Sequence, residues 1–200
     1  SVSQRMAVSI DLDERGVATV RANSASGPTL LEGTTAGTVD VAVAADGQPG
    51  FSARMRGETS AFTPTSGALA GLADAATTTS DRRRTLDSIA NDFAASLNAW
   101  SQGGVDANGQ AGAAVLAGVG AAGLRMALTD PSEIAAGLPG GSANGNLIGL
   151  EAQRAQGAED RHAALVTSQA QQVAATKTQA AAHAVRRDNA PHARDAVSGV

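Results

Sequence analysis

The chain has 200 residues, a formal net charge of −4 and no cysteine. The lack of cysteine excludes disulfides, thiolate metal sites and cysteine nucleophiles, and a sequence pI near 5.3 argues against a nucleic-acid-binding surface. Hydrophobic residues make up 42% of the chain, but more than half of them are alanine, so we expect thin helix contacts lined by alanine rather than a thick core.

Residues 1–64 are expected to hold the end of a helix and a small antiparallel β region. No helix breaker interrupts 1–7, and from Val8 the apolar residues recur at every second position, which is the period of a strand. The turn residues at 13–16 and the β-branched stretch after them predict a β-hairpin over 8–20.

A second hairpin is predicted farther along the same region. Residues 38–44 carry valines at alternate positions, 46–50 hold turn residues, and 51–56 can return as a strand. We therefore expect one small antiparallel sheet across 8–62.

The most regular pattern of the chain is a run of mostly apolar positions spaced alternately by three and four residues. This spacing predicts one stripe along a long helix at 65–103, which needs partner helices to cover it. The residues around Pro64 suit a helix start, and Gly103 with Gly104 suits its end. The stripe, named here the heptad seam, consists of Leu69, Leu72, Ala76, Thr79, Arg83, Leu86, Ala90, Phe93, Leu97 and Trp100.

Residues 104–142 are rich in glycine and are expected to form a short, irregular insert. Asp130, Pro131 and Glu133 occupy the N-cap, N1 and N3 positions of a helix start, which predicts one or two helical turns before Gly137. Two short strands are also expected in this insert, at 114–116 and 124–128.

Residues 143–200 are predicted to form a helical return segment that packs on the long helix. One helix is expected from Asn146 and a longer one after Gly157, where Ala, Gln and Leu recur at helical spacing. Pro191 predicts that the longer helix ends or kinks near Asn189.

The segment 118–123 reads Gly-Val-Gly-Ala-Ala-Gly, which is the GxGxxG spacing of dinucleotide-binding loops. In such loops the glycines permit a tight turn and let a phosphate approach a helix N-terminus. Here at most six residues follow before Asp130 and Pro131 interrupt the pattern, and no further buried strand follows. We therefore interpret the motif as a chance match in a chain with 23 glycines.

Asp106 and Asn108 resemble the opening of a calcium loop, but Ala111 and Ala117 stand where an EF-hand needs Gly and an acidic ligand. We expect instead a turn in which Asp106 and Asn108 bond the local backbone.

The three histidines are spaced by 21 and 9 residues, which is too far apart for a metal pair on one helix. The arginine run at 82–84 is interpreted as a solvated helix face. We therefore assign no catalytic, cofactor-binding or metal-binding residue, and we expect no cofactor. The histidines are His162, His183 and His192.

Residues 86–99, LDSIANDFAASLNA, followed by GVDANG at 104–109, resemble hook-associated protein 1 of the bacterial flagellum. In that family a long helix of the type LDxIAxxLAxxLN leads directly into a GVDxNG turn. Further matches keep the family's order along 67–200. They are GALAGL at 67–72, DP and IAA within 130–136, and GN followed by two leucines within 145–150.

The resemblance implies an α+β fold, an elongated bundle of long antiparallel helices with a small antiparallel β region, as in flagellin and hook-associated proteins. It implies an extracellular structural component of the flagellum that links hook to filament, and not an enzyme. The implied partners are the hook protein, a second junction protein, neighbouring copies and a type III export chaperone that binds C-terminal to this sequence. Family members are exported unfolded through the flagellar type III channel.

Two departures from the family are expected to matter. The terminal helices through which the family polymerises are missing, so we expect a central fragment that is monomeric by itself. The stretch between Gly109 and Gly145, where relatives often carry a large outer β domain, has only about 35 residues. We therefore expect little or no outer domain. No membrane partner is expected either, because no apolar stretch reaches the roughly 18 residues that cross a bilayer.

Two alternatives stay open from the sequence. The chain could be another flagellar axial or surface-exposed binding protein, flagellin-like or hook-like. Glycan binding by such a protein is disfavoured because stacking rings are scarce, with 2% aromatic residues. A nucleotide-binding enzyme that uses 118–123 is the weaker alternative.

Overall fold

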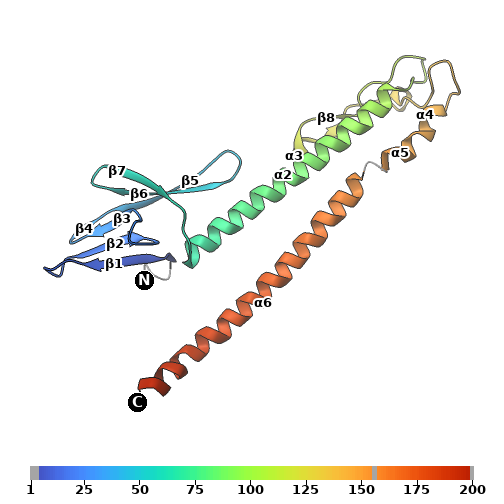
Figure 1. Cartoon of the computed structure of the whole chain (residues 1–200). Helices are drawn as coiled ribbons and strands as arrows, with labels where there is room; N and C mark the ends of the chain where they lie inside the picture. The colour runs from blue at the N-terminus through green and yellow to red at the C-terminus, as the bar shows by residue number, and fades with distance from the viewer. Residues whose placement is uncertain (1–4, 155–156, 199–200) are drawn as a thin grey trace. The chain divides into compact units, whose positions relative to one another are not determined.

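The computed structural model describes residues 5–154 and 157–198, and the fold is α+β. By its internal contacts the chain divides into two units, 1–85 and 86–200. The division falls inside the long helix α2 (Gly67–Gln102), which contributes residues to both units (Figure 1). Each unit is therefore described by itself.

The first unit contains two small antiparallel sheets where we predicted one sheet across 8–62. The prediction was wrong, because β4 ends at Ala36 and β5, which begins at Thr38, belongs to a second sheet. The first sheet has the order β1-β2-β3-β4, and the second β5-β6-β7. The strands are β1 (Val8–Leu12), β2 (Ala18–Ala22), β3 (Thr29–Glu32), β4 (Thr35–Ala36), β5 (Thr38–Val43), β6 (Pro49–Met55) and β7 (Glu58–Phe62).

Both predicted hairpins are confirmed. In the first, Ile10 pairs with Val20, and the Asp13 side chain accepts hydrogen bonds from the backbone N–H groups of Arg15 and Val17. In the second, β5 pairs with β6 over its whole length. Three of the described strands were missed, β3, β4 and β7, since none of them shows a clear alternation of apolar residues.

The core of the first unit is small. Phe51 and Ala53 of β6 are buried, and the rings of Phe51 and Phe62 lie 6.2 Å apart. The side chains of Met6 and Ala22 are also buried. Of the predicted helix end at 1–7, residues 1–4 lie outside the described residues.

The long helix α2 confirms the prediction at 65–103 and ends just before Gly103 and Gly104. Its heptad seam is unevenly covered. Ala90 is buried, whereas Leu72 is 66% exposed and Phe93 is 41% exposed. The seam is therefore a stripe with open apolar positions rather than a closed core.

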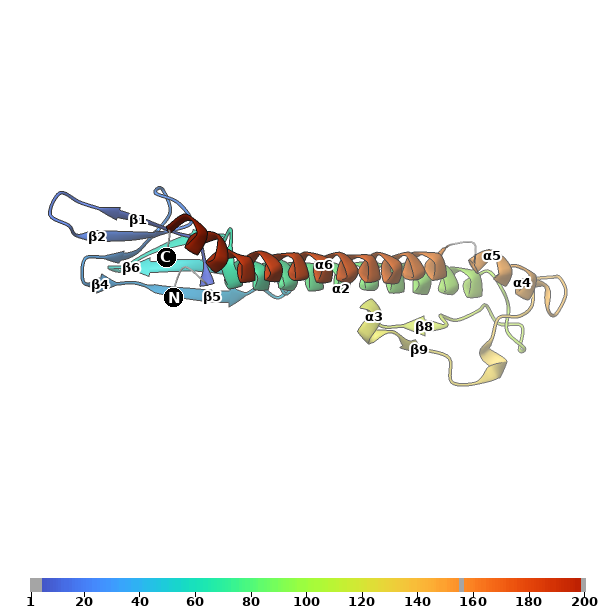
Figure 2. The same cartoon turned by 90° about the horizontal axis from the view of Figure 1, so that it is seen from below.

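In the second unit, a folded-back segment lies beside the C-terminal half of α2 (Figures 1 and 2). Its elements are β8 (Leu116–Ala117), α3 (Gly120–Gly123), β9 (Arg125–Met126) and a 3-10 turn, η1 (Pro131–Glu133). β8 and β9 pair antiparallel close to the predicted strands. The capping box predicted at Asp130 and Glu133 is confirmed.

The chain then continues through α4 (Gly145–Ile148), α5 (Leu150–Arg154) and α6 (Ala158–Ser198). We predicted that the last helix ends or kinks near Asn189. It does not end there, because α6 continues through Pro191. Proline removes one backbone N–H, and water can satisfy the carbonyl left unpaired because the helix is exposed there. From His162 to Pro191, all side chains except Leu165 and Ala184 are exposed.

Candidate functional site

A stripe of polar side chains holds the folded-back segment against α2. Asp87, Asn91, Asn98 and Ser101 follow one another at spacings of four, seven and three residues. These spacings place the four side chains on one face of a helix. The face, named here the polar stripe, is distinct from the heptad seam, because successive residues of a helix are about 100° apart.

Each member of the polar stripe bonds the backbone of the folded-back segment. Asn98 does so twice: its Nδ2 donates to the carbonyl oxygen of Leu116 at 2.9 Å, and its Oδ1 accepts from the Leu116 N–H at 2.9 Å. The hydroxyl of Ser101, a fully buried side chain, donates to the carbonyl oxygen of Ala113 at 2.7 Å. The side-chain amide of Asn98 thus replaces a strand partner for Leu116.

The glycine motif at 118–123 is used for this packing. The backbone N–H of Gly120 donates to Asn91 Oδ1 at 2.8 Å, and that of Ala121 donates to Asp87 Oδ1 at 2.8 Å. These N–H groups at the start of α3 are those a dinucleotide-binding loop would direct at a phosphate. Here they bind a carboxylate and an amide of the protein itself.

Two glycines of the motif are required by the backbone. Gly118 has a φ of +103°, and a Cβ there would lie 1.9 Å from the carbonyl oxygen of Gly123. Gly120 has a φ of +69°, and a Cβ would lie 2.6 Å from Asp87 Oδ1. The first two glycines therefore permit close approach to the chain itself and to α2.

A second cluster closes the C-terminal end of α2. The indole Nε1 of Trp100 donates to the carbonyl oxygen of Asn146 at 2.8 Å. In return, Asn146 Nδ2 donates to the carbonyl oxygens of Trp100 at 3.2 Å and Ala135 at 2.7 Å. Asn146 is buried, and a Cβ at Gly104 would lie 2.3 Å from its Nδ2. This reciprocal contact fixes the start of α4 to the end of α2.

The predicted turn after α2 is confirmed for Asp106, whereas the Asn108 side chain donates to Asp106 Oδ2 at 3.5 Å rather than to the backbone. Asp106 Oδ1 accepts hydrogen bonds from the N–H groups of Asn108 and Gln110, at 2.8 and 2.7 Å. Asp106 is thus satisfied by its own loop. No cluster of three or more potential metal-ligating side chains occurs in the searched part of the chain, residues 5–154 and 157–198.

The exposed turn at η1 carries a carboxylate with a perturbed pKa. The hydroxyl and the backbone N–H of Ser132 both donate to Asp130 Oδ1, at 2.6 and 2.8 Å. These bonds favour the ionised form and lower the pKa of Asp130, the hydroxyl having the larger effect. Glu133 completes the turn by accepting from the Thr129 N–H at 2.8 Å.

In the first unit, hydrogen bonds near the start and in the middle of α2 fix the β region to the helix. Asn23 donates to the carbonyl oxygen of Thr63 at 2.8 Å and accepts from the backbone N–H of Thr65 at 3.2 Å. Farther along α2, the Ser80 hydroxyl donates to the carbonyl oxygen of Asp46 in the β5–β6 turn. The chain is therefore held by side-chain bonds just before α2 begins and again about four turns later.

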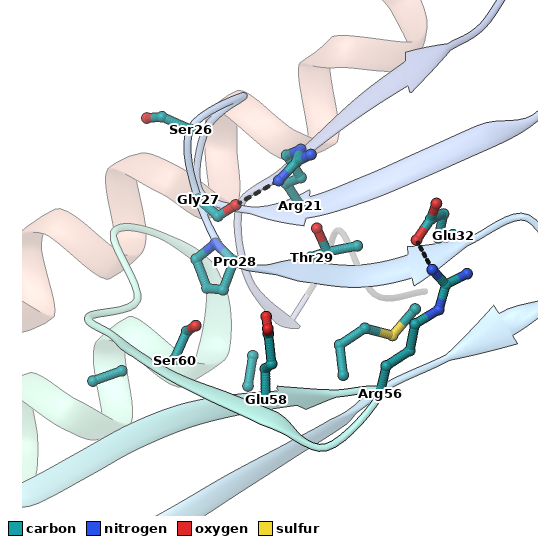
Figure 3. Close-up of a pocket in the computed structure, with 12 residues that line it drawn as sticks. Arg21, Ser26, Gly27, Pro28, Thr29, Glu32, Arg56, Glu58 and Ser60 are labelled. Carbon is teal, nitrogen blue, oxygen red and sulfur yellow. Dashed lines mark hydrogen bonds and ion pairs between the residues drawn. The ribbon is translucent and has the colours of Figure 1, made fainter.

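A cavity of about 680 Å³ lies between the two sheets of the first unit (Figure 3). Arg56 pairs with Glu32 at 3.2 Å across it, and Arg21 donates to the carbonyl oxygen of Gly27 at 3.3 Å. The cavity lining has two basic and two acidic side chains. Its described residues include no histidine that could activate the Ser60 hydroxyl and no cysteine that could act as a nucleophile. The arrangement joins the two sheets.

A more apolar groove of about 510 Å³ lies in the second unit beside the heptad seam. One wall is formed by Phe93 and Leu97 of α2, and the other by α4, α5 and the start of α6. Arg161 of α6 binds Asp92 of α2 at 2.6 Å beside it. The groove is lined by Phe93, Leu97, Leu147, Leu150, Glu151, Gln153, Ala158 and Glu159.

Comparison with known families decides what this arrangement belongs to. A family model described as the flagellar hook-associated protein FlgK helical domain matches residues 1–116, which is more than half of the chain. The chain belongs to the FlgK family. No curated protein and no solved structure gave a match.

The match confirms the expected resemblance to flagellar hook-associated proteins. FlgK-family proteins are structural proteins of the flagellum and act in motility. The matched region also includes the β region before α2, which the sequence motifs at 67–200 did not cover. Among the described residues, no helix combines the length and apolarity needed to span a membrane.

Sequence reasoning missed the polar stripe and the Asn146–Trp100 contact. One signal was present: Asp87, Asn91 and Asn98 have low helix propensity and recur on one face of a predicted helix. Such residues in mid-helix indicate side chains that bond something other than water. The partner segment could not be identified from the spacing alone.

Proposed function

We propose that this FlgK-family protein is a hook–filament junction protein, a structural link between the hook and the filament. The observation that carries the proposal is the way α2 is held. Side chains of α2 bond other segments of the chain in the middle of the helix and toward its end, through Ser80, Asn98 and Trp100. Just before the helix, the backbone N–H of Thr65 donates to Asn23. A helix tied at these intervals suits a part that transmits force.

The proposal includes close packing of residues 143–200 on the helix at 65–103, as an elongated antiparallel bundle. Support comes from two apolar stripes with open positions. The seam exposes Leu72 and Phe93, and α6 exposes Val166 and Val173 one heptad apart. In the proposed antiparallel bundle, the Arg161–Asp92 ion pair is the point from which the register is counted. Packing in this register buries both stripes, which is favourable by roughly 25 cal/mol per Å² of apolar surface.

In the complete assembly, the proposed partners are the hook protein, a second junction protein and neighbouring copies of the same protein. The short insert at 104–142 takes the place of a large outer domain. Export through the flagellar type III system, assisted by an export chaperone, brings the protein outside the cell. A chain without cysteine suits this route, because no disulfide can form before threading.

Immunogold electron microscopy on intact flagella tests the proposal. An antibody raised against this chain should label a single narrow band where the hook meets the filament. Labelling along the whole filament would favour a flagellin-like subunit, and labelling along the whole hook would favour a hook-like subunit. Either result would overturn the junction role while leaving membership of the FlgK family intact.

A further inference from the structure

The tripeptide Ala-Asn-Gly occurs twice in the chain, at 107–109 and at 143–145. In an Asn-Gly pair the backbone nitrogen of the glycine reaches the side-chain amide carbon of the asparagine easily, because glycine has no Cβ to obstruct the approach. The two sites therefore share the same local chemistry in an unfolded chain. A difference between them in the folded protein comes from the structure around each tripeptide.

The first tripeptide lies in an exposed turn. Ala107, Asn108 and Gly109 are all exposed, and nothing lies within 4 Å of a Cβ placed on Gly109. The Gly109 N–H donates to the carbonyl oxygen of Asp106 at 3.1 Å, and the Asn108 side chain donates to Asp106 Oδ2 at 3.5 Å. Because these two bonds stay within the turn, the peptide between Asn108 and Gly109 can rotate by a local opening.

The second tripeptide is attached to buried groups. Gly145 is buried, and a Cβ there would lie 2.6 Å from Leu138 Cδ1. The next residue, Asn146, is also buried, and its side chain donates to the carbonyl oxygen of Trp100 at 3.2 Å. Rotation of the peptide between Asn144 and Gly145 therefore disturbs the contact between α2 and α4.

We propose that Asn108 is a site of spontaneous deamidation in the folded protein, whereas Asn144, in the same tripeptide, is protected by the contact between α2 and α4. The modification needs no enzyme and no reactant besides water. It does not depend on the junction role, because it follows from the turn alone.

The reaction proceeds through a cyclic imide. The Gly109 nitrogen loses its proton to hydroxide from the solvent and attacks Asn108 Cγ. The new N–Cγ bond closes a succinimide ring, the Cγ–Nδ2 bond breaks, and Nδ2 leaves as ammonia after taking a proton from water. A water molecule then opens the ring. Opening at Cγ gives aspartate, and opening at the main-chain carbonyl carbon gives isoaspartate, in which the chain continues through the side chain.

The product changes the turn after α2. Both forms place a carboxylate beside Asp106, where Asn108 Nδ2 donates before the reaction. An ionised carboxylate has no proton to donate, and the two like charges repel. Isoaspartate also adds a methylene to the main chain, which moves the Gly109 N–H away from the Asp106 carbonyl. The turn should therefore loosen, together with the 3.2 Å bond from the Ala107 N–H to the Ser132 carbonyl oxygen.

Peptide mapping of the aged protein tests the assignment. The purified chain is incubated folded, and separately in urea, in water enriched in heavy oxygen, which marks deamidation that precedes digestion. Mass spectrometry should show Asn108 reacting at least about tenfold faster than Asn144 in the folded protein, and the two rates converging in urea. No deamidation at Asn108, equal rates in the folded protein, or an unchanged ratio in urea would each overturn the proposal.

A variant of the turn tests whether local opening sets the rate. Asp106→Ala removes the acceptor of two backbone N–H groups of the turn. The rate at Asn108 should rise about threefold or more, while that at Asn144 stays the same. Asp13→Ala is the matched control, because Asp13 accepts two backbone N–H groups in the β1–β2 turn, and it should change neither rate. No rise at Asn108, or an equal rise at Asn144, would contradict control by local opening.

Hydrogen exchange measures the consequence for the turn. The deamidated protein carries one more negative charge and can be separated by ion exchange. Its Ala107 amide should exchange faster than in the unmodified protein, whereas the Trp100 indole N–H, bonded to Asn146, should exchange at the same rate. Equal exchange at Ala107 in the two forms would show that the product does not loosen the turn.

Discussion

Asn98 and Asn146 carry more of the fold than their size suggests. Asn98 bonds Leu116 through both the oxygen and the nitrogen of its side-chain amide. Asn146 accepts from Trp100 through its backbone carbonyl and donates to Ala135 through its side chain. No described side-chain polar atom that is buried lacks a partner. In a chain with few large apolar side chains, such polar contacts favour one packing arrangement over the alternatives.

Gly118 offers a test of how tightly the folded-back segment is held. Gly118→Ala should destabilise the protein by at least about 2 kcal/mol, because the residue has a positive φ and its Cβ would meet the carbonyl oxygen of Gly123. Gly123→Ala in the same motif should change stability by less than about 0.5 kcal/mol, because nothing lies within 4 Å of its Cβ. Urea unfolding measures both, and equal effects would contradict this account.

Asp130 provides a test through its pKa. Ser132→Ala removes the hydroxyl that lowers the pKa most, so the pKa of Asp130 should rise toward its ordinary value. Because the folded pKa lies below the unfolded one, ionised Asp130 stabilises the turn above the unfolded pKa. That stabilisation is lost as the pH falls through the folded pKa.

Carboxyl NMR titration measures this change. Thr129→Ala serves as the control, since the recorded hydrogen bond of Thr129 uses its backbone N–H. A pKa of Asp130 that does not move in Ser132→Ala would show that the hydroxyl is not the cause.

Among the elements, α2 serves two sets of contacts at once. Its polar stripe bonds the segment of β8 and α3, while its heptad seam forms one wall of the apolar groove. The seam predicted the helix correctly because apolar period depends only on local sequence. The polar stripe could not be assigned a partner from sequence, because its partners are backbone groups, which every residue possesses.

The same reasoning explains the other differences between expectation and structure. The hairpins at β1–β2 and β5–β6 carry alternating β-branched residues and clear turn signals. By contrast, β3 and β7 gain strand character mainly from hydrogen bonding to β2 and β6. Pro191 did not end α6, because solvent can replace the lost bond on an exposed helix. Predictions from local sequence failed where pairing with a neighbouring strand, or hydration of an exposed helix, determined the secondary structure.

The contact between α2 and α4 can be followed with the single tryptophan. Asn146→Ala should destabilise the protein by about 1–3 kcal/mol, because it removes the recorded donor of the buried Ala135 carbonyl oxygen and one of the donors of the Trp100 carbonyl oxygen. Trp100 emission should shift to longer wavelength as the indole becomes wetter. Asn144→Ala, whose side chain makes no cap bond at the start of α4, should change neither quantity. An unchanged Trp100 spectrum in Asn146→Ala would contradict the proposed role of this contact.

For the whole molecule, the proposed packing of α6 on α2 makes a geometric prediction. Starting from the Arg161–Asp92 ion pair, an antiparallel register brings Ala181 level with Leu72, since Ala181 lies 20 residues after Arg161 and Leu72 lies 20 residues before Asp92. Spin labels at Leu72→Cys and Ala181→Cys should then be within about 20 Å, given helix axes about 10 Å apart. Pulsed electron resonance measures this distance. A broad distribution centred far above that value would contradict the bundle.

The junction role itself is tested most directly by electron microscopy of cells that lack the gene for this protein. The account predicts hooks that end without filaments, and filaments that reappear when the gene is restored. Filaments still joined to hooks in the deleted strain would contradict it.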